Sequence, residues 1–343
     1  MGCKEVDLVK WTKNMDPIDF SPLHNTLLED AEGDRQPRDE PYFKAKLIAP
    51  GTWQVLSDGD YVYVLEGDNE LICIDSGMGA GNIRAFCQSL VPDKPLYRTL
   101  TTHCHFDHTA NNYLFDVAYM SEKTYENRCN PLGEMAKLDF PDDYPVVFLK
   151  EGDVVNLKGR PLEVIAVEDH SLGSLQFLDR KNRILFSGDE YNGVVYSSNF
   201  SLEHSYRQTS KLMQYRSAFD RFCAGNGIFD VSYLDKCHAG IRYLLDGHTS
   251  EGEELYEAYL DPISSVDELD GKRVIARRSP DVSRLEQPLR EAGYGTWIDV
   301  LGGKVGLQLK RKLTPNGIFD RQLMFEGIRI IYYCNRIWES PTT

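Results

Sequence analysis

Three of the eight histidines lie within six residues, and this cluster constrains the fold more than any other feature of the 343-residue chain. Residues 102–109 read Thr-His-Cys-His-Phe-Asp-His-Thr and follow a short apolar run that predicts a strand. Imidazole and carboxylate groups are the donors that zinc and similar metals prefer. His103 and His105 can point the same way from a loop, and Asp107 and His108 can turn toward a neighbouring position. The cluster therefore predicts a site for one metal ion or two adjacent ions.

Three other segments accompany the cluster, and their order along the chain is informative. They are Ile72–Gly77 (Ile-Cys-Ile-Asp-Ser-Gly), Asp169–Ser174 (Asp-His-Ser-Leu-Gly-Ser) and Leu185–Asp189 (Leu-Phe-Ser-Gly-Asp). Together with the H-x-H-x-D-H pattern, they closely resemble the metallo-β-lactamase fold superfamily of metallohydrolases, from about residue 47 to residue 260. The resemblance implies an α/β (α+β) fold, a four-layer αβ/βα sandwich, here with a small basic C-terminal insertion.

The same resemblance implies a set of metal ligands. The first metal would be held by His103, His105 and His170, the second by Asp107 and His108, and Asp189 would bridge both. Asp75 would be a structural residue behind the histidine loop. The implied cofactor is zinc, as one or two ions, with iron or manganese as alternatives.

The last ligand of the second site departs from the family pattern. The family closes this site with a histidine in a Gly-His pattern, but the matching segment here is Ala224–Gly227, so Asn226 stands in that place. An amide oxygen is a weaker and harder ligand than imidazole. His238 and His248 are two other histidines downstream, although the first lies within a predicted helix and the second follows it. The occupancy of the second site is therefore open.

The predicted chemistry is hydrolysis by a metal-bound hydroxide at a carbonyl centre, with an ester or lactone ahead of a thioester. Asp107 is the candidate to orient the nucleophile and move a proton, and Tyr191 is a candidate hydrogen-bond donor to a developing oxyanion. Two alternatives remain. One is a metal-poor or mononuclear binding or sensor protein of the same fold, and the other is a non-hydrolytic iron enzyme.

Charge and composition narrow the partners. The chain has 53 acidic and 38 basic residues, a net charge of −15, which argues against a nucleic-acid-binding surface. No apolar stretch is long enough to cross a membrane, and the first residues contain no apolar signal region. The eight cysteines are scattered, as in a cytoplasmic protein with reduced thiols. We therefore expect a cytoplasmic enzyme with a small-molecule substrate, no nucleic-acid or membrane partner, and a homodimer as one candidate assembly.

The pattern of turns and charges divides the chain into four parts. These are an acidic N-terminal arm (1–44), the metallo-β-lactamase-like core (45–262), a basic insertion or small subdomain (263–321), and C-terminal strands that return to the core (322–343). Residues 271–321 contain eleven basic and five acidic residues. Strands are predicted at 52–56, 61–66, 71–75, 97–101, 146–149, 154–157, 162–167, 175–178, 184–187, 323–325 and 328–333. Helices are predicted up to residue 90 and at 205–219 and 232–245.

Overall fold

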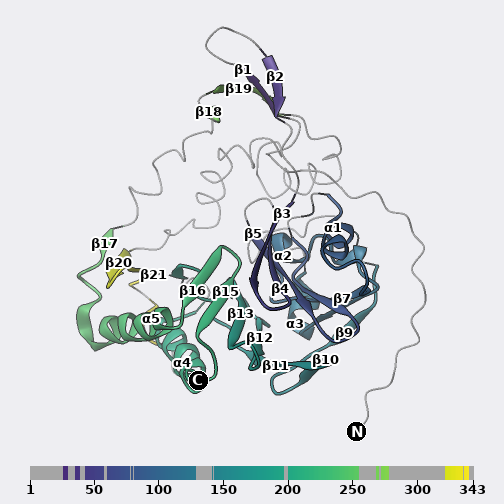
Figure 1. Cartoon of the computed structure of the whole chain (residues 1–343). Coiled ribbons are helices and arrows are strands. Elements are labelled where there is room, and N and C mark those ends of the chain that lie inside the picture. Colours follow the sequence, from purple (N-terminus) through teal and green to yellow (C-terminus); the bar gives the residue numbers. More distant parts are fainter. Residues whose placement is uncertain are drawn as a thin grey trace.

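Two β-sheets that pack face to face form the centre of the molecule, with helices on their outer sides (Figure 1). The computed structural model describes residues 26–29, 35–38, 43–57, 60–77, 79, 81–128, 141, 143–196, 200–254, 268–269, 272–277, 321–334 and 336–339. Over these residues the chain has the mixed α/β architecture in four layers that the sequence predicts.

The first sheet has seven strands. They are, in spatial order, β3 (Phe43–Ala49), β4 (Thr52–Ser57), β5 (Asp60–Glu66), β6 (Leu71–Ile74), β7 (Leu96–Leu100), β8 (Val117–Met120) and β9 (Val146–Phe148). Neighbouring strands are antiparallel from β3 to β6 and parallel from β6 to β9. Because β6 and β7 are parallel, the segments that follow them leave the sheet at the same edge.

The second sheet has six strands. They are, in spatial order, β10 (Val154–Leu157), β11 (Arg160–Ala166), β12 (Leu175–Asp179), β13 (Ile184–Gly188), β15 (Arg221–Ala224) and β16 (Gly227–Asp230). β13 and β15 are parallel, and Gly188 at the end of one lies opposite Ala224 at the end of the other. The sequence did not predict β3, β8, β15 or β16 as strands.

Helices cover the outer face of each sheet. The longer ones are α1 (Ile83–Leu90) on the first sheet, and α4 (Leu202–Met213) and α5 (Ser232–Tyr243) on the second. Shorter ones are α2 (Phe106–Thr109), α3 (Glu122–Asn127), η1 (Asn112–Leu114) and η2 (Leu244–His248). Asn82 and Ser201 cap α1 and α4, because each side chain accepts a backbone N–H of the first turn. α4 ends at Met213, whereas the sequence predicted a helix as far as residue 219.

Strand alternation explains why both faces of each sheet are buried. In β5, Tyr63 and Leu65 face the second sheet, whereas Val62 and Val64 face α1. In β13, Phe186 faces the first sheet and Leu185 faces the helices. The layer between the sheets is formed by Tyr63, Leu65, Ile72, Ile74, Leu100, Val155, Leu157, Leu162, Val164, Leu175, Phe177, Ile184, Phe186 and Cys223. This apolar layer fixes the spacing of the strand ends at which the site is built.

Two smaller sheets involve the ends of the chain. One contains β14 (Val194–Tyr196), β21 (Ile328–Tyr332), β20 (Arg321–Phe325) and β17 (Glu253–Glu254). The C-terminal strands thus pair with β14, which lies between β13 and β15 in the chain. The other contains β18 (Glu268–Leu269), β19 (Lys272–Arg277), β1 (Thr26–Glu29) and β2 (Arg35–Arg38). β1 therefore joins the predicted N-terminal arm to the predicted basic insertion. Most of both segments lies outside the described residues, and the four-part division stays a prediction.

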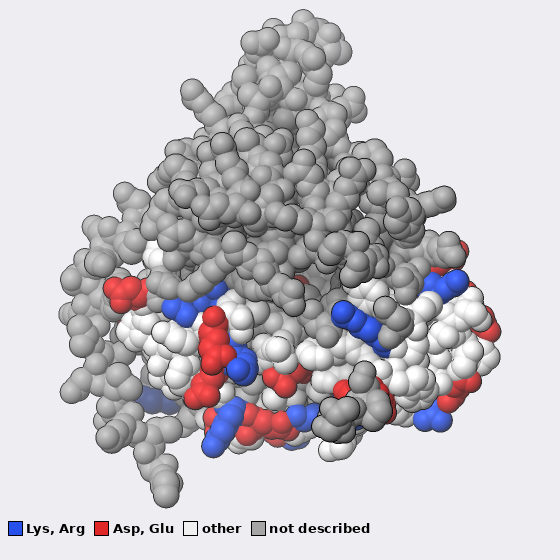
Figure 2. All heavy atoms as spheres, turned by 180° about the vertical axis from the view of Figure 1, so that it is seen from behind, with Lys and Arg blue, Asp and Glu red and all other residues white. Residues whose placement is uncertain are grey.

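The described surface has mixed charge. On the face shown in Figure 2, the described Lys and Arg side chains are interspersed with Asp and Glu, and neither sign gathers there into one patch. Several charged side chains of the described residues form exposed ion pairs, such as Arg183 with Asp220. Among the described residues, no helix combines the length and the apolar character needed to cross a bilayer.

Candidate metal centre

The loop after β7 places the histidine cluster at the edge where the two sheets meet. Thr101 donates its N–H to Tyr119 of β8, and Leu175 of β12 donates its N–H to Thr102, so the loop is bonded to both sheets. His105 is extended (φ −64°, ψ 151°), and α2 begins at the next residue. His103 and His105 therefore leave an extended segment, whereas His108 comes from the first helical turn.

Three imidazole nitrogens converge in a first group. His103 Nε2 lies 3.0 Å from His105 Nδ1, and His170 Nε2 lies 3.0 Å from the same atom. One nitrogen from each ring lies within 4.8 Å of the other two. His170 belongs to the segment before β12, and the structure therefore brings together the three histidines that the resemblance assigned to the first metal.

The electrostatics of this group favour neutral imidazoles. Burial, followed by the nearby imidazoles, lowers the pKa of His103 well below the usual histidine value. Burial and His170 lower the pKa of His105 to about 3, and burial also lowers the pKa of His170. Neutral imidazole is the form that binds a metal, so these three side chains are ready to donate lone pairs near pH 7.

A second group contains His103, His108 and Asp189, again with the possible ligand atoms within 4.8 Å of one another. His108 Nε2 lies 3.3 Å from Asp189 Oδ1, and His170 Nε2 lies 3.8 Å from Asp189 Oδ2. Asp189 thus lies between the two sets of histidines, at the end of β13. Asp107 Oδ2 lies 3.9 Å from His108 Nε2.

Buried polar atoms without partners mark this group as a place for a cation. His108 Nε2 and Asp189 Oδ1 have no hydrogen-bond partner among the described residues. Burial lowers the pKa of His108, but the carboxylates, Asp189 first and then Asp75, outweigh burial and raise this pKa well above the usual value. A buried polar atom without a partner costs free energy, and a metal ion with this donor set would satisfy both atoms. The residues present therefore fit a metal.

Asp75 anchors the loop from behind. Its Oδ1 accepts the N–H of Thr102 at 2.7 Å, and its Oδ2 lies 2.8 Å from Thr102 Oγ1 and 2.8 Å from His108 Nδ1. Asp75 is 2% exposed and has a φ of 62°, which is rare for a residue with a side chain. The contact at Nδ1 leaves Nε2 of His108 as the atom directed at Asp189, which is how carboxylates orient metal-binding histidines.

Glu190 anchors His170 in a similar way. Its buried carboxylate accepts the backbone N–H groups of Asp169 and His170 at 3.0–3.2 Å. Asp169 in turn accepts the hydroxyl of Ser205 of α4 at 2.6 Å. Burial raises the pKa of both carboxyls, that of Asp169 to about 7 and that of Glu190 well above the usual value. The backbone of His170 is thereby fixed to the residue after Asp189.

The turn between β15 and β16 approaches the site through its backbone. A Cβ on Gly225 would collide with Asp189 Oδ1 and lie 3.1 Å from His108 Cε1, so only glycine fits there. Asn226 follows it and is exposed, with its amide nitrogen 3.5 Å from the place that a Cβ on Gly193 would take. The role of Asn226 as a metal ligand therefore stays a prediction.

Asp60 is a site residue that the sequence reasoning missed. It opens β5, and its carboxylate, that of Asp107 and a ring nitrogen of His108 form a third group of donors within 4.8 Å of one another. Burial and the charge of Asp107 raise the pKa of Asp60 well above the usual value, and burial also raises that of Asp107. The only local signal was an aspartate in a Ser-Asp-Gly-Asp turn, which is typical of an ordinary hairpin.

Three other candidate residues are Tyr191, His238 and His248, and the hydroxyl of Tyr191 has no hydrogen-bond partner among the described residues. Tyr191 is 3% exposed in the core around α4 and α5, and burial, followed by the charges of Asp169 and Glu190, raises its pKa well above the usual value. His238 Nε2 lies 3.0 Å from Ser210 Oγ, and His248 Nδ1 lies 2.7 Å from Glu251. Tyr191 thus lies near Asp169 and Glu190, the residues that flank His170 and Asp189 in the chain. His238 and His248 lie on α5 and η2, where Ser210 and Glu251 are their partners.

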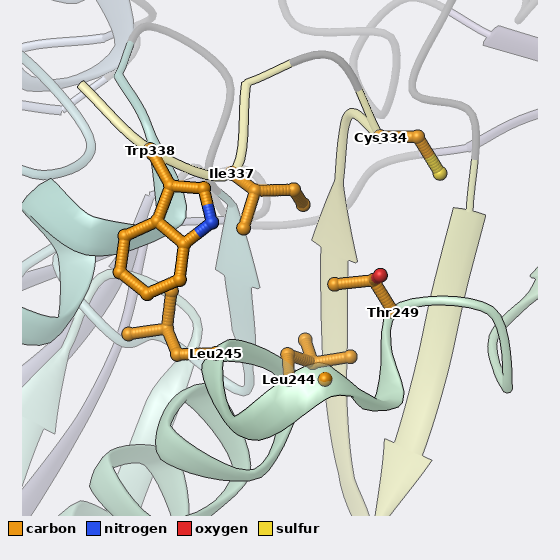
Figure 3. A pocket seen from close by; sticks show the side chains of 7 residues that line it. Leu244, Leu245, Thr249, Cys334, Ile337 and Trp338 are labelled. Atoms are coloured by element: carbon orange, nitrogen blue, oxygen red, sulfur yellow. The ribbon is translucent and has the colours of Figure 1, made fainter. Parts of the chain in front are cut away.

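A pocket of about 300 Å³ lies at the end of α5 and is separate from these groups (Figure 3). It is lined by Leu244, Leu245, Gly247, Thr249, Cys334, Ile337 and Trp338. None of these residues belongs to the three groups of metal donors.

The comparisons with known proteins agree with this geometry. Residues 58–197 match the sequence model of the metallo-beta-lactamase superfamily. This segment of the chain contains the three groups of donors and ends before Asn226. The human acyl-coenzyme A thioesterase MBLAC2 is 27% identical over 169 residues, 40% of this chain and 59% of the relative. A probable metallo-hydrolase of Streptococcus pyogenes serotype M6 is 27% identical over 148 residues, 38% of this chain and 61% of the relative. The chain thus spans about three fifths of the curated relatives that it matches.

One solved structure supports the fold. A double mutant of the sec-alkyl sulfatase PisA1 superposes with a TM-score of 0.51 at 14% identity, over 76% of this chain and 54% of that one. This likeness concerns the arrangement of strands and helices alone. Residues 58–197, which include the donor groups, therefore resemble the metallo-beta-lactamase superfamily in sequence, and the strand order agrees with its mixed α/β fold.

Proposed function

We propose that the chain is a metal-dependent hydrolase that acts at the carbonyl carbon of an ester or thioester. The observation that carries this proposal is the convergence of three imidazole nitrogens. His103 Nε2 and His170 Nε2 each lie 3.0 Å from His105 Nδ1, and the lowered pKa values of His103 and His105 favour the neutral form of these rings. Three such nitrogens beside a buried carboxylate are the donor set of a hydrolytic metal site that keeps a position open.

Each residue has a distinct part in the proposed reaction. His103, His105 and His170 would hold the first metal, Asp107 and His108 would hold the second, and Asp189 lies where it could contact both. When bound, such a metal lowers the pKa of water and polarises an acyl oxygen. Asp107 is 22% exposed at the side chain and can hold or release a proton at its carboxyl oxygen beside the reacting carbonyl. Asp75 and Glu190 position the ligands, and the role of Tyr191 as a hydrogen-bond donor to the oxyanion stays a prediction.

The names of the relatives support a thioester. Three vertebrate relatives, each 27% identical, are acyl-coenzyme A thioesterases. This reverses the order that the sequence suggested, in which an ester or lactone came ahead of a thioester. Thioesters and oxygen esters differ in their leaving group but share a carbonyl carbon. The proposed metal site would act on that carbon in both substrate classes.

Metal identity, compartment and assembly belong to the same proposal. Zinc suits a site with three imidazoles, whereas iron or manganese would suit the carboxylate-rich side. All six cysteines among the described residues are free thiols, five of them buried, which agrees with a cytoplasmic protein. We also propose a small-molecule substrate, no nucleic-acid or membrane partner, and a homodimer.

The test compares two histidine variants. His103→Ala should remove the metal of the first group and lower the rate of hydrolysis at least about 100-fold. Loss of a residue that only orients a ligand already lowers metal affinity or activity by about 10–100-fold, and His103 is itself a proposed ligand. His248→Ala is the matched control, because this histidine contacts Glu251 and Tyr243 on the surface. Metal content by elemental analysis and hydrolysis of acyl-coenzyme A, a nitrophenyl ester and a γ-lactone are measured for both.

Three outcomes separate the alternatives. If His103→Ala keeps its metal and its rate, the proposal is wrong. If the natural protein holds metal but hydrolyses none of the three substrates, a binding or sensor protein of this fold becomes the better description. If the purified protein contains iron and shows redox behaviour, the non-hydrolytic iron enzyme takes its place.

A further inference from the structure

The second metal position lacks the histidine that would complete it, and the described chain offers another residue at the same place. Asn226 is exposed and its amide lies toward Gly193. Gly225 takes the position closest to the site and presents backbone there, since any Cβ would collide with Asp189. The β15–β16 turn therefore shapes one wall of the site without supplying a side-chain ligand.

The strand that carries Asp60 is bonded to this very turn. Tyr61 donates its N–H to the carbonyl of Gly225 at 2.6 Å, and the hydroxyl of Tyr63 donates to the carbonyl of Ala224 at 2.6 Å. These two bonds join β5 of the first sheet to the end of β15 in the second. Asp60, one residue before Tyr61, is thereby placed beside Gly225 and opposite His108.

The donor atoms around this place include two that lack partners. His108 Nε2 is fully buried, has no hydrogen-bond partner among the described residues, and lies 3.9 Å from Asp107 and 3.3 Å from Asp189. His108 Nδ1 is occupied by Asp75, so its Nε2 is the nitrogen available on this side. Asp189 Oδ1 also has no hydrogen bond among the described residues, and its contact is the ion pair with this nitrogen.

We propose that Asp60 is the ligand that completes the second metal position, in place of the family histidine and of Asn226. The position then has three carboxylates (Asp60, Asp107 and Asp189) and one imidazole (His108), whereas the first has three imidazoles and shares Asp189. The inference rests on the metal centre of the proposed function but not on its substrate.

Charge balance supports this role. Asp60 and Asp107 are carboxyl groups in contact at a largely buried place, and Asp189 adds a third negative charge nearby. Two ionised carboxylates repel at this distance unless a proton or a cation lies between them. A divalent ion bound to both groups would remove this repulsion. Such an oxygen-rich donor set is harder than the first position, so it should accept manganese more readily than the three-histidine position does.

The experiment uses the isosteric variant Asp60→Asn in the full chain. Metal is removed with a chelator, and each protein is titrated with Zn²⁺ by calorimetry, with the bound metal counted by elemental analysis. The natural protein should bind two equivalents, and Asp60→Asn should bind the first unchanged and the second at least about 10-fold more weakly. Asn226→Ala is the control and should keep both equivalents.

Thermal unfolding distinguishes a ligand from a structural residue. In metal-free protein, Asp60→Asn removes a like-charge contact and should leave the melting temperature equal or higher, whereas with saturating Zn²⁺ it should lower it. A purely structural role would lower the melting temperature in both states.

Each contrary result has one meaning. Two unchanged equivalents in Asp60→Asn, or a single equivalent in the natural protein at saturation, would overturn the role of Asp60 and leave the first position intact. Loss of all metal from the natural protein would instead overturn the proposed function. If Asp60→Asn melts lower in both states, Asp60 is structural and the inference is wrong.

Discussion

Two buried polar clusters lie at opposite ends of the space between the sheets, and they differ in how completely they are hydrogen-bonded. Arg160 begins β11 and Asp179 ends β12, whereas the histidine cluster lies where β12 begins and β13 ends. Arg160 donates to Asp179 at 2.8 Å, to the carbonyl of Gly51 at 2.5 Å and to Thr52 Oγ1 at 2.7 Å. Neither charged side chain of this pair has a buried atom without a partner among the described residues.

The histidine cluster is less buried, since the side chains of Asp107 and His170 are 22% and 18% exposed, and it is not complete by itself. His108 Nε2 and Asp189 Oδ1 lack partners, and the carboxyls of Asp60 and Asp107 crowd each other. The first cluster thus connects the two sheets, because Thr52 and Gly51 belong to the first and Arg160 and Asp179 to the second. The second cluster is organised for a ligand that the chain does not contain. A polar cluster with all partners in the chain indicates stability, and one with partners missing indicates a site.

The largest expected effect is at the complete cluster. Asp179→Ala leaves the Arg160 guanidinium buried without its partner, and breaking such a pair costs about 3–5 kcal/mol of unfolding free energy. Asp220→Ala, which breaks the exposed pair with Arg183, is the matched control and should leave the free energy of unfolding nearly unchanged. Both are measured by denaturant unfolding. Metal content should stay unchanged in both, and a loss of metal in Asp179→Ala would show that the two clusters are coupled.

The sequence predicts these two clusters unequally, and the reason is the range of the contacts. His103, His105 and His108 are close in sequence and belong to a rare pattern, so one strand and one turn suffice to place them. His170 and Asp189 come from other strands, and only their family resemblance indicated them. Asp60 and Arg160 depend on the register between strands more than 100 residues apart in the chain, as in the bond from Tyr61 to Gly225. No local pattern distinguishes such an aspartate or arginine from an exposed one.

The same limit applies to the elements themselves. Strands with clear alternation or apolar runs, such as β5 and β13, were predicted within one residue of their bounds. β8 and β15 are four residues long, and their pairing with neighbouring strands, which the sequence does not display, defines them. The predicted helix at 205–219 ends at Met213 in the structure. The prediction ran too far because Tyr215, Ala218 and Phe219, which enter the core from turns, have an apolar spacing similar to that of a helix.

A middle-sized effect is expected where the histidine cluster depends on a partner in the chain. Asp75→Asn keeps the shape of the side chain but replaces one acceptor oxygen with a donor. It must therefore weaken the contacts with Thr102 or with His108 Nδ1. We expect a 10–100-fold loss of metal affinity, the usual result for a partner that orients a ligand.

Competition with a chromogenic chelator measures this affinity. Gln88→Ala, a partly buried polar change on α1 that breaks bonds to Lys94 and Leu96, serves as the control for general destabilisation. An unchanged metal affinity in Asp75→Asn would show that the histidine loop keeps its geometry without Asp75. The difference between the two clusters would then be smaller than we infer.

The smallest effect is expected at Asn226, where the family pattern would suggest the largest. Because the side chain at this position is exposed and we assign the second metal position to Asp60, Asn226→His should add an imidazole that does not bind the metal. Unfolding free energy should change by no more than about 0.5 kcal/mol, as for an ordinary surface substitution. Metal content and the rate of ester hydrolysis should stay the same. A second metal ion bound only by Asn226→His would mean that residue 226 can reach the site and that Asp60 does not complete the second metal position. This variant therefore tests directly whether the histidine cluster already contains all the ligands of that position.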